Sequence, residues 1–404
     1  MTQEGIRGNE EMPDATHNTT LPFTRYLAGA GDYTLCYFNN RVKNTKAHQL
    51  AMAAVYYSPL QFMFWYDRPE FYQGEEELEF WKAIPSVWDD SRALDGDMLF
   101  EDRQGFEKAI NGVYVGLVDR SLYGRNLSAG VIDLMAQYYK YGNGSDFNSM
   151  LGAYKYEEQN VKDVFQVIWE KAYALILNCN IIIEKCDERQ DVLPGVYYGL
   201  YKGEALALRA MLHLDMLRLF GPVYDETSKT AECIPYVTNT DAQISPLLSA
   251  EVVLESVIGD LKTALNLLKE SDPVLTDGVR NEGNSIGDNA LNYRQFRLNY
   301  YAVKALLVRA YAWGHDESNA LVTAEEILRE VQVEGAEIFP FVTHAAATDV
   351  SKPDRVFSSE VMFSLYDSYR GTEIQDKLFL PTLDQIYTFT GKRLELGSLS
   401  GNQR

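Results

Sequence analysis

Acidic side chains lie close together in the first polar stretch of the chain. Glu4 and Glu10 flank Arg7-Gly8-Asn9, so two carboxylates stand beside a guanidinium and an amide. Carboxylate oxygens are preferred calcium ligands, and a carboxyl group can also serve as a general acid. Two glutamates at this spacing are also common on a solvated surface. The spacing alone therefore leaves a calcium site, a general acid and a solvated turn as open interpretations.

The elements around these carboxylates alternate between helix and strand. An apolar run over 46–57 predicts a buried helix that Ser58-Pro59 ends, and 75–82 predicts a short acidic helix. The apolar and aromatic residues over 62–66 predict a buried strand. Such alternation is typical of an α/β barrel, in which functional groups lie at strand ends.

Several blocks in this part of the chain match one enzyme family in order. Residues 4–94 resemble the C-terminal part of the catalytic barrel of glycoside hydrolase family 97. The blocks are EGIRGNEE, HNTTLPFTRYLAGAGDYT, KAHQLAMAAVYYSPLQF and PSVWDDSRAL. The resemblance implies that 1–96 is an α/β fragment of a TIM-barrel glycosidase of α-glucosidase or α-galactosidase type. It also implies that Glu10 takes the place of the general acid, and that Glu4 and Glu10 bind calcium.

We expect this fragment to be inactive alone. A glycosidase needs two carboxyl groups on opposite sides of the scissile bond, and the family's general base comes from barrel segments without a counterpart here. Two alternatives remain open. The fragment is an active calcium-dependent α-glucosidase or α-galactosidase, alone or with a partner, or the chain is a fusion or assembly product of neighbouring genes.

From residue 97 onward the sequence changes to helical periodicity. Apolar residues recur every three or four positions, and 197–220 is apolar on two sides, which is typical of stacked helical repeats. Gly221-Pro222 ends that helix, and Ser249 is a candidate N-cap for the next. The pattern predicts polar loops over 139–148, 224–246 and 271–292. It predicts helices over 102–117, 161–186, 197–220, 250–268, 295–313 and 320–331.

The blocks of this second segment resemble the SusD/RagB family. They are LFEDRQGFEKAINGVYVGL, VIWEKAYALILNCNIII, GEALALRAMLHLDMLRLFGPV, RQFRLNYYAVKALLVRAYAW and RVFSSEVMFSLY. The resemblance implies a mainly α, tetratricopeptide-like fold over 97–404, incomplete at its C-terminus. It implies a surface protein of the outer membrane that binds oligosaccharide and partners a SusC-like TonB-dependent transporter. The family's signal peptide and acylated cysteine are not visible in this chain.

Aromatic and polar side chains gather at one predicted loop. Tyr138, Tyr139 and Tyr141 precede the run Gly-Asn-Gly-Ser-Asp, and Asp133 lies shortly before them. Exposed tyrosines can stack on sugar faces, while polar groups bond to the hydroxyls. These four residues are the candidate glycan contacts, and ordinary packing of the tyrosines is the alternative.

Composition narrows the partners. The net charge of −21 and the pI near 4.7 argue against nucleic acid, which requires clustered Lys and Arg. Cys179 and Cys186 fall on one apolar helical stripe, which predicts buried thiols, and the absence of a CxxC pair argues against a zinc site.

One charged set lies on the predicted helix over 197–220. It comprises Glu204, Arg209, Asp215 and Arg218, which we interpret as ion pairs to neighbouring helices and not as an acid–base cluster. His213 lies within an apolar stripe without a second potential ligand, which predicts a core histidine.

Overall fold

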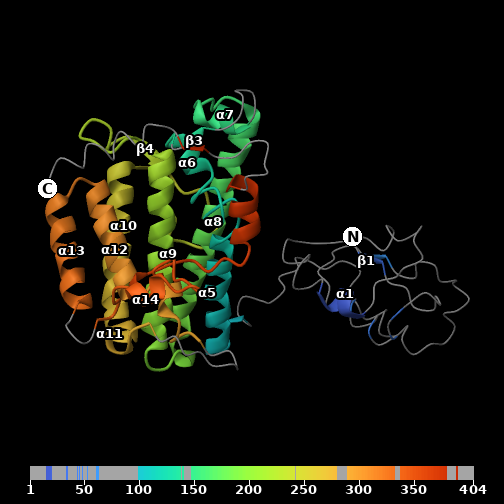
Figure 1. Cartoon of the computed structure of the whole chain (residues 1–404), viewed down its shortest axis with the longest axis vertical. Coiled ribbons are helices and arrows are strands. Elements are labelled where there is room, and N and C mark those ends of the chain that lie inside the picture. Colours follow the sequence, from blue (N-terminus) through green and yellow to red (C-terminus); the bar gives the residue numbers. More distant parts are fainter. Residues whose placement is uncertain are drawn as a thin grey trace, which may run out of the picture. The chain divides into compact units, whose positions relative to one another are not determined.

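The computed structural model divides the chain into two compact units, Met1–Met98 and Leu99–Arg404, each described by itself here (Figure 1). The division predicted from the sequence follows residue 96. The structure describes residues 15–20, 33–34, 43, 45, 48, 52, 61–62, 99–137, 139–140, 147–241, 243–279, 289–332, 337–379 and 388–389.

The described part of the first unit contains a short helix and a pair of parallel strands. Helix α1 spans Ala15–Thr20, and strand β1 (Tyr33–Thr34) pairs with β2 (Gln61–Phe62). His48 and Met52, from the helix predicted over 46–57, are helical. The helix predicted over 75–82 and the rest of the predicted barrel fragment lie outside the described residues.

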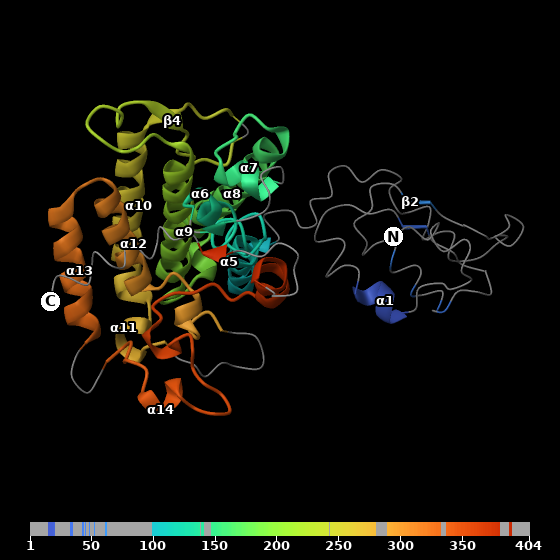
Figure 2. The same cartoon turned by 45° about the horizontal axis from the view of Figure 1, so that its top comes forward.

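The second unit is an array of long helices, and the predicted mainly α fold is confirmed. Helix α9 packs between α8 and α10, while α12 lies against α10, α13 against α12, and α5 against α8 (Figures 1 and 2). The long helices are α5 (Arg103–Leu117), α8 (Gln159–Glu188), α9 (Tyr197–Phe220), α10 (Ala250–Ser271), α12 (Tyr300–Trp313) and α13 (Glu317–Val331).

Helix α9 is at the centre of this array because it is apolar on two sides. Both of its predicted stripes are largely buried, including Leu208, Leu212 and Leu217, which are fully buried. The approach of α10 is close at Gly203, where a Cβ atom would lie 2.8 Å from Cγ of Leu268. A side chain at this position would therefore push α9 and α10 apart.

Side-chain caps determine where several helices begin. Ser249 caps α10 as predicted, since its side chain accepts a hydrogen bond from the Val252 amide. The helix predicted over 295–313 begins later, because the Asn299 side chain accepts from the Ala302 amide and caps α12. The preceding Arg294–Phe296 forms a separate 3-10 turn, η6.

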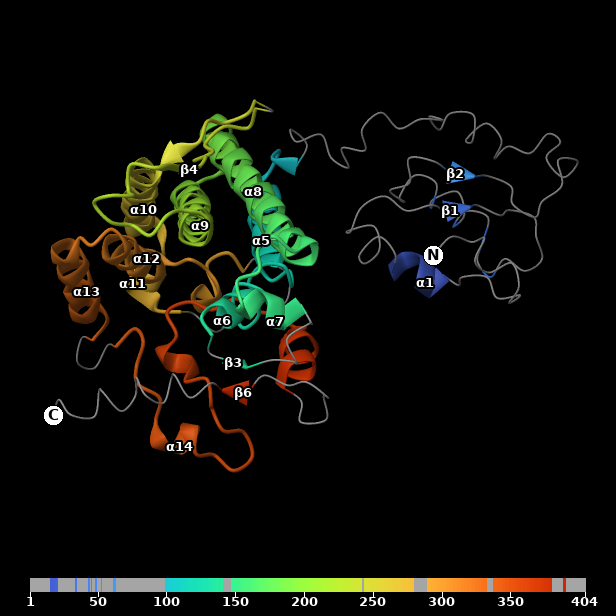
Figure 3. The same ribbon diagram turned by 90° about the horizontal axis from the view of Figure 1, so that it is seen from above.

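Short elements surround the helical array. Helix α6 (Val131–Met135), α7 (Phe147–Gly152) and the β3–β6 pair gather on one side, as Figure 3 shows. The predicted loops also hold short strands and a short helix. The remaining elements are β3 (Tyr139–Lys140), β4 (Glu232–Ile234), β5 (Leu248–Ser249), β6 (Thr388–Phe389), α11 (Val274–Asp277), α14 (His344–Ala347), η5 (Gln190–Val192), η7 (Ser358–Glu360) and the π-helical η8 (Gly371–Phe379).

In the part of the chain that the structure describes, every helix is too short or too polar to cross a membrane.

Candidate functional site

The residues predicted to contact glycan fall on α6 and β3. Asp133 is half-buried on α6 and is already engaged in an interaction. The backbone of Tyr139 pairs with Phe389 of β6. The predicted contacts Tyr138 and Tyr141 lie outside the described residues, as do Glu4 and Glu10.

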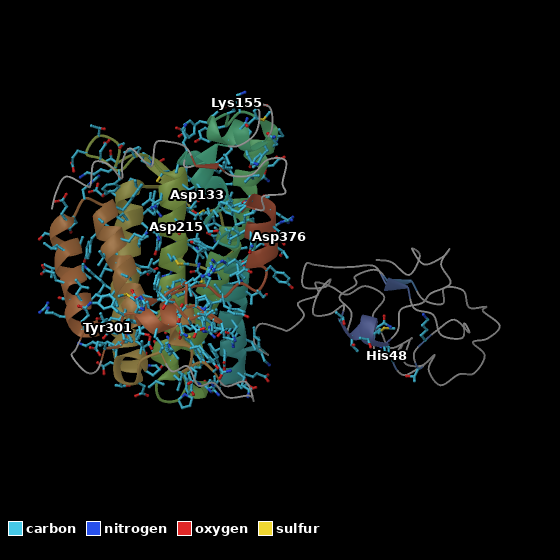
Figure 4. All side chains as sticks on the ribbon, in the orientation of Figure 1. His48, Asp133, Lys155, Asp215, Tyr301 and Asp376 are labelled. Carbon is cyan, nitrogen blue, oxygen red and sulfur yellow. The ribbon has the colours of Figure 1, made fainter. Side chains whose placement is uncertain are left out.

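A pocket of about 240 Å³ lies between the segment that precedes α6, α6 itself, α7 and η8. Figure 4 labels Asp133 on α6 and Asp376 on η8, two of the elements that enclose it. None of the lining residues belongs to a motif that is recognisable in the sequence. They are Arg125, Asn126, Gly130, Val131, Leu134, Phe147, Asn148, Lys377 and Leu378.

One carboxylate pairs with both cations of this pocket. The Glu373 carboxylate lies 2.7 Å from Nζ of Lys377 and 3.5 Å from the Arg125 guanidinium. The hydrogen bond from Lys377 lowers the pKa of Glu373 from its ordinary value. The Asn126 side-chain amide also lines the pocket and has no partner among the described residues. The pocket thus offers an amide, apolar surface and a pair of cations that share one carboxylate, all of which can contact a polyhydroxyl ligand.

Two side chains join the ends of α6 and α7 beside the pocket. The Tyr154 hydroxyl donates to the Met135 carbonyl at 2.8 Å, and the Gln137 amide donates to the Gly152 carbonyl at 3.3 Å. Tyr154 and Gln137 both have positive φ angles, 57° and 56°. Surrounding contacts must hold such residues in place, which is common at ligand sites.

Exposed aromatic rings follow α7 directly. Tyr154 and Tyr156 are 47% and 42% exposed, and their ring centroids are 6.1 Å apart. The Tyr156 ring packs edge-on against Phe165 of α8, which fixes its orientation. Exposed, oriented tyrosine rings provide flat surfaces on which a sugar ring can stack.

The charged set on α9 makes ion pairs between elements, as predicted. Glu204 pairs with Arg294 of η6, and Asp215 pairs with Arg309 of α12 as well as Arg218. A third pair joins Arg209 of α9 to Asp260 of α10. We therefore assign these residues to the packing of the array.

His213 is a core histidine, also as predicted. It is fully buried; its Nδ1 lies 2.9 Å from the Arg209 carbonyl, and its Nε2 accepts the Val237 amide at 3.0 Å. A neutral imidazole with its proton on Nδ1 satisfies both contacts. Burial lowers the pKa of His213 to about 3.

The buried imidazole predicts a dependence of stability on pH. The unfolded chain binds a proton at His213 below its ordinary pKa of 6.5 and the folded chain does not, so stability falls as pH drops from 6.5 toward 3. From pH 7 to pH 5 this contribution costs about 2 kcal/mol. The unfolding free energy should therefore fall less between pH 7 and pH 5 for His213→Gln than for the wild type, which denaturant unfolding at both pH values measures. An equal loss in both proteins would contradict this assignment, and His344→Gln, at an exposed position, is the matched control.

The two predicted core thiols are buried on α8. Burial raises the pKa of Cys179 and of Cys186 to about 12. Both therefore remain protonated and serve as small apolar side chains at neutral pH. Among the residues that the structure describes, no three acidic, histidine or cysteine side chains gather as a metal site would require.

Comparison with known proteins gives two kinds of match. Residues 96–276 match a SusD-like family described as "Starch-binding associating with outer membrane". A SusD-like protein of Formosa agariphila is 35% identical over 99 residues, which cover 24% of this chain and 17% of that protein. A retaining alpha-galactosidase of Bacteroides thetaiotaomicron is 32% identical over 116 residues, with the same coverage of both chains. The chain thus spans about a sixth of the length of these curated relatives.

A solved structure has the same fold as the helical array. It is a SusD superfamily protein from Bacteroides thetaiotaomicron, with a TM-score of 0.54 and 19% sequence identity over 74% of this chain and 62% of the other. The SusD-type helical fold predicted from the sequence is therefore confirmed. Residues 96–276 are thus similar to the SusD-like family, and the helical unit that contains them has the fold of a SusD superfamily protein.

Proposed function

We propose that this protein binds a neutral oligosaccharide at the pocket between α6, α7 and η8 and does not cleave it. The family that matches residues 96–276 is described as starch-binding, which supports a glycan as the ligand. The observation that carries the proposal is the pocket itself. Asn126 lines it with a side-chain amide that has no partner among the described residues, and the pocket's two cations, Arg125 and Lys377, share the carboxylate of Glu373.

The predicted contacts extend this site. Asp133 and Tyr139 belong to elements beside the pocket, and Tyr138 and Tyr141 adjoin β3 in the sequence. Tyr154 and Tyr156 add exposed rings. In the proposal one sugar enters the pocket while neighbouring sugars of the same chain lie along these tyrosines.

The wider role follows from the family resemblance. We propose that binding occurs at the outer membrane and delivers the glycan to a SusC-like TonB-dependent transporter. The alpha-galactosidase match and the blocks over 4–94 support a hydrolase origin for 1–96. We propose that this part is catalytically inactive even if Glu4 and Glu10 retain calcium, because a single remaining acid cannot complete the glycosidase pair.

The Asn126→Ala variant tests the pocket. Loss of a single neutral hydrogen bond removes about 1 kcal/mol of binding free energy, so we expect roughly fivefold weaker binding of maltohexaose. Calorimetric titration of the full chain measures it. Asn178→Ala on α8, an exposed asparagine without a partner among the described residues, is the control and should leave the affinity unchanged. Equal affinities for wild type and Asn126→Ala would place the ligand elsewhere.

A further inference from the structure

A second hollow lies at the other side of the array, between α10, α12 and α13. Its volume is about 630 Å³, within the usual range of ligand sites. It shares no lining residue with the pocket of the proposed function. It continues into a hollow of about 890 Å³ beside α11. Lys269, Tyr300, Arg329 and Glu330 line both hollows, which therefore form one groove.

Two of the four cations in the first hollow have no partner among the described residues. Lys304 is paired, since its Nζ lies 3.1 Å from Glu326 and 2.7 Å from Glu330. Lys269 and Arg329 make no ion pair or side-chain hydrogen bond with any described residue. Lys262 lies over the Tyr311 ring, at 5.7 Å, and is close enough to Asp316 to interact electrostatically with that carboxyl. The positive charge is confined to the first hollow, where four cations face two carboxylates, whereas the continuation beside α11 adds the carboxylates of Asp277 and Glu337.

The spacing of these cations restricts the ligand. Lys262 and Lys269 are seven residues apart on α10, which places them on one face and about 10 Å apart along the helix axis. Arg329 reaches the same hollow from α13. A small anion cannot contact all three positions, so the groove matches an extended ligand with several negative charges.

Two hydrogen-bonding groups of the groove favour a saccharide. Oε2 of Glu330 is buried without a hydrogen-bond partner, and an O–H donor from a ligand would satisfy it. The Asn266 amide lines the same hollow. A peptide would need backbone N–H and C=O groups of the protein as hydrogen-bond partners. The lining residues of this hollow belong to helices. Even the first amide of α12, at Tyr300, already donates to Asp272.

We propose that the groove between α10, α12 and α13 is a second binding site, specific for an oligosaccharide that carries carboxylate or sulfate groups. Lys262, Lys269 and Arg329 contact the anionic groups, while Glu330 and Asn266 bond to hydroxyls. The large negative net charge of the chain opposes non-specific binding of polyanions. Affinity for such a ligand therefore measures binding to this groove and not attraction to the chain as a whole.

Calorimetric titration of the full chain tests the proposal. The probes are hexa-α-galacturonate, which carries carboxylates, and sulfated maltohexaose, which carries sulfates. Lys269→Glu and Arg329→Glu should each weaken binding of at least one probe by about tenfold, because each removes a charge-assisted hydrogen bond. Lys108→Glu on α5, exposed and without a partner among the described residues, is the matched charge reversal and should have little effect.

The outcomes separate this site from the first. Neutral maltohexaose should bind Lys269→Glu as it binds wild type, whereas Asn126→Ala should bind the anionic probes normally. Three results would overturn the proposal: no binding of either anionic probe, an equal effect of Lys108→Glu, or equally tight binding of hexaglutamate. The last result would mean that the groove recognises charge on any extended chain, including a peptide.

Discussion

The Arg294→Met variant should lose about 3 to 5 kcal/mol of unfolding free energy, because it leaves the buried carboxylate of Asp272 without its cation and that of Glu204 with Arg297 alone, at 3.9 Å. Arg294 is fully buried and donates to both carboxylate oxygens of Asp272, each at 3.0 Å. It also donates to Glu204 at 2.6 Å. The remaining oxygen of Glu204 accepts from the Tyr114 hydroxyl. One side chain thus connects η6 with α9 and with the residue that follows α10.

Denaturant unfolding of the full chain measures this effect. Arg329→Met is the matched control, since Arg329 is exposed and unpaired among the described residues, and it should change stability by less than about 0.5 kcal/mol. Neutralising the carboxylates in Arg294→Met/Glu204→Gln/Asp272→Asn should recover part of the loss. A loss below 1 kcal/mol for Arg294→Met would contradict the assignment of Arg294 as the cation of this cluster.

The second large effect is expected for Arg209→Met, which should cost about 3 kcal/mol. Arg209 donates from Nε and Nη2 to both oxygens of Asp260, at 2.7 and 2.8 Å, and from Nη1 to Asn180 at 2.9 Å. These contacts join α8, α9 and α10. The Asn180 amide in turn donates to the carbonyls of Val237 and Asn239, so the segment after β4 depends on the same cluster.

Hydrogen exchange distinguishes this effect from a general loss of stability. Amides near Val237 should exchange faster in Arg209→Met, since the Arg209 side chain holds Asn180, which donates to the carbonyls of Val237 and Asn239. Arg355→Met, at an exposed position, should leave both stability and exchange unchanged. Unaltered exchange near Val237 would show that the segment is anchored by other contacts.

The sequence predicted the long helices well, because their apolar stripes are local patterns. The helix over 197–220 has the predicted bounds, and its two-sided stripe places it at the centre of the array. The predicted start of α12 at residue 295 was wrong: the apolar pattern continues before Asn299, but the Asn299 side chain caps a helix that begins at Tyr300. The apolar pattern gives no information about this capping hydrogen bond.

The pocket could not be predicted in the same way. Arg125 and Glu373 are 248 residues apart in sequence, and only the folded chain brings η8 to α6. The predicted contacts Tyr138, Tyr139 and Tyr141 are not among the described residues that line it, and Asn126 lies in a turn without a recognisable pattern. Likewise, the cations of the α10–α13 groove could not be recognised as a site in the sequence, since single exposed lysines are common on any helix.

Hydrogen–deuterium exchange of the full chain with maltohexaose, read by mass spectrometry, tests the central claim most directly. The account predicts slower exchange over 125–135, 147–156 and 371–379, the elements around the pocket, with the oligosaccharide recovered intact from the same sample. Protection confined to other segments, or the appearance of shorter sugars, would contradict a binding protein with its site between α6, α7 and η8.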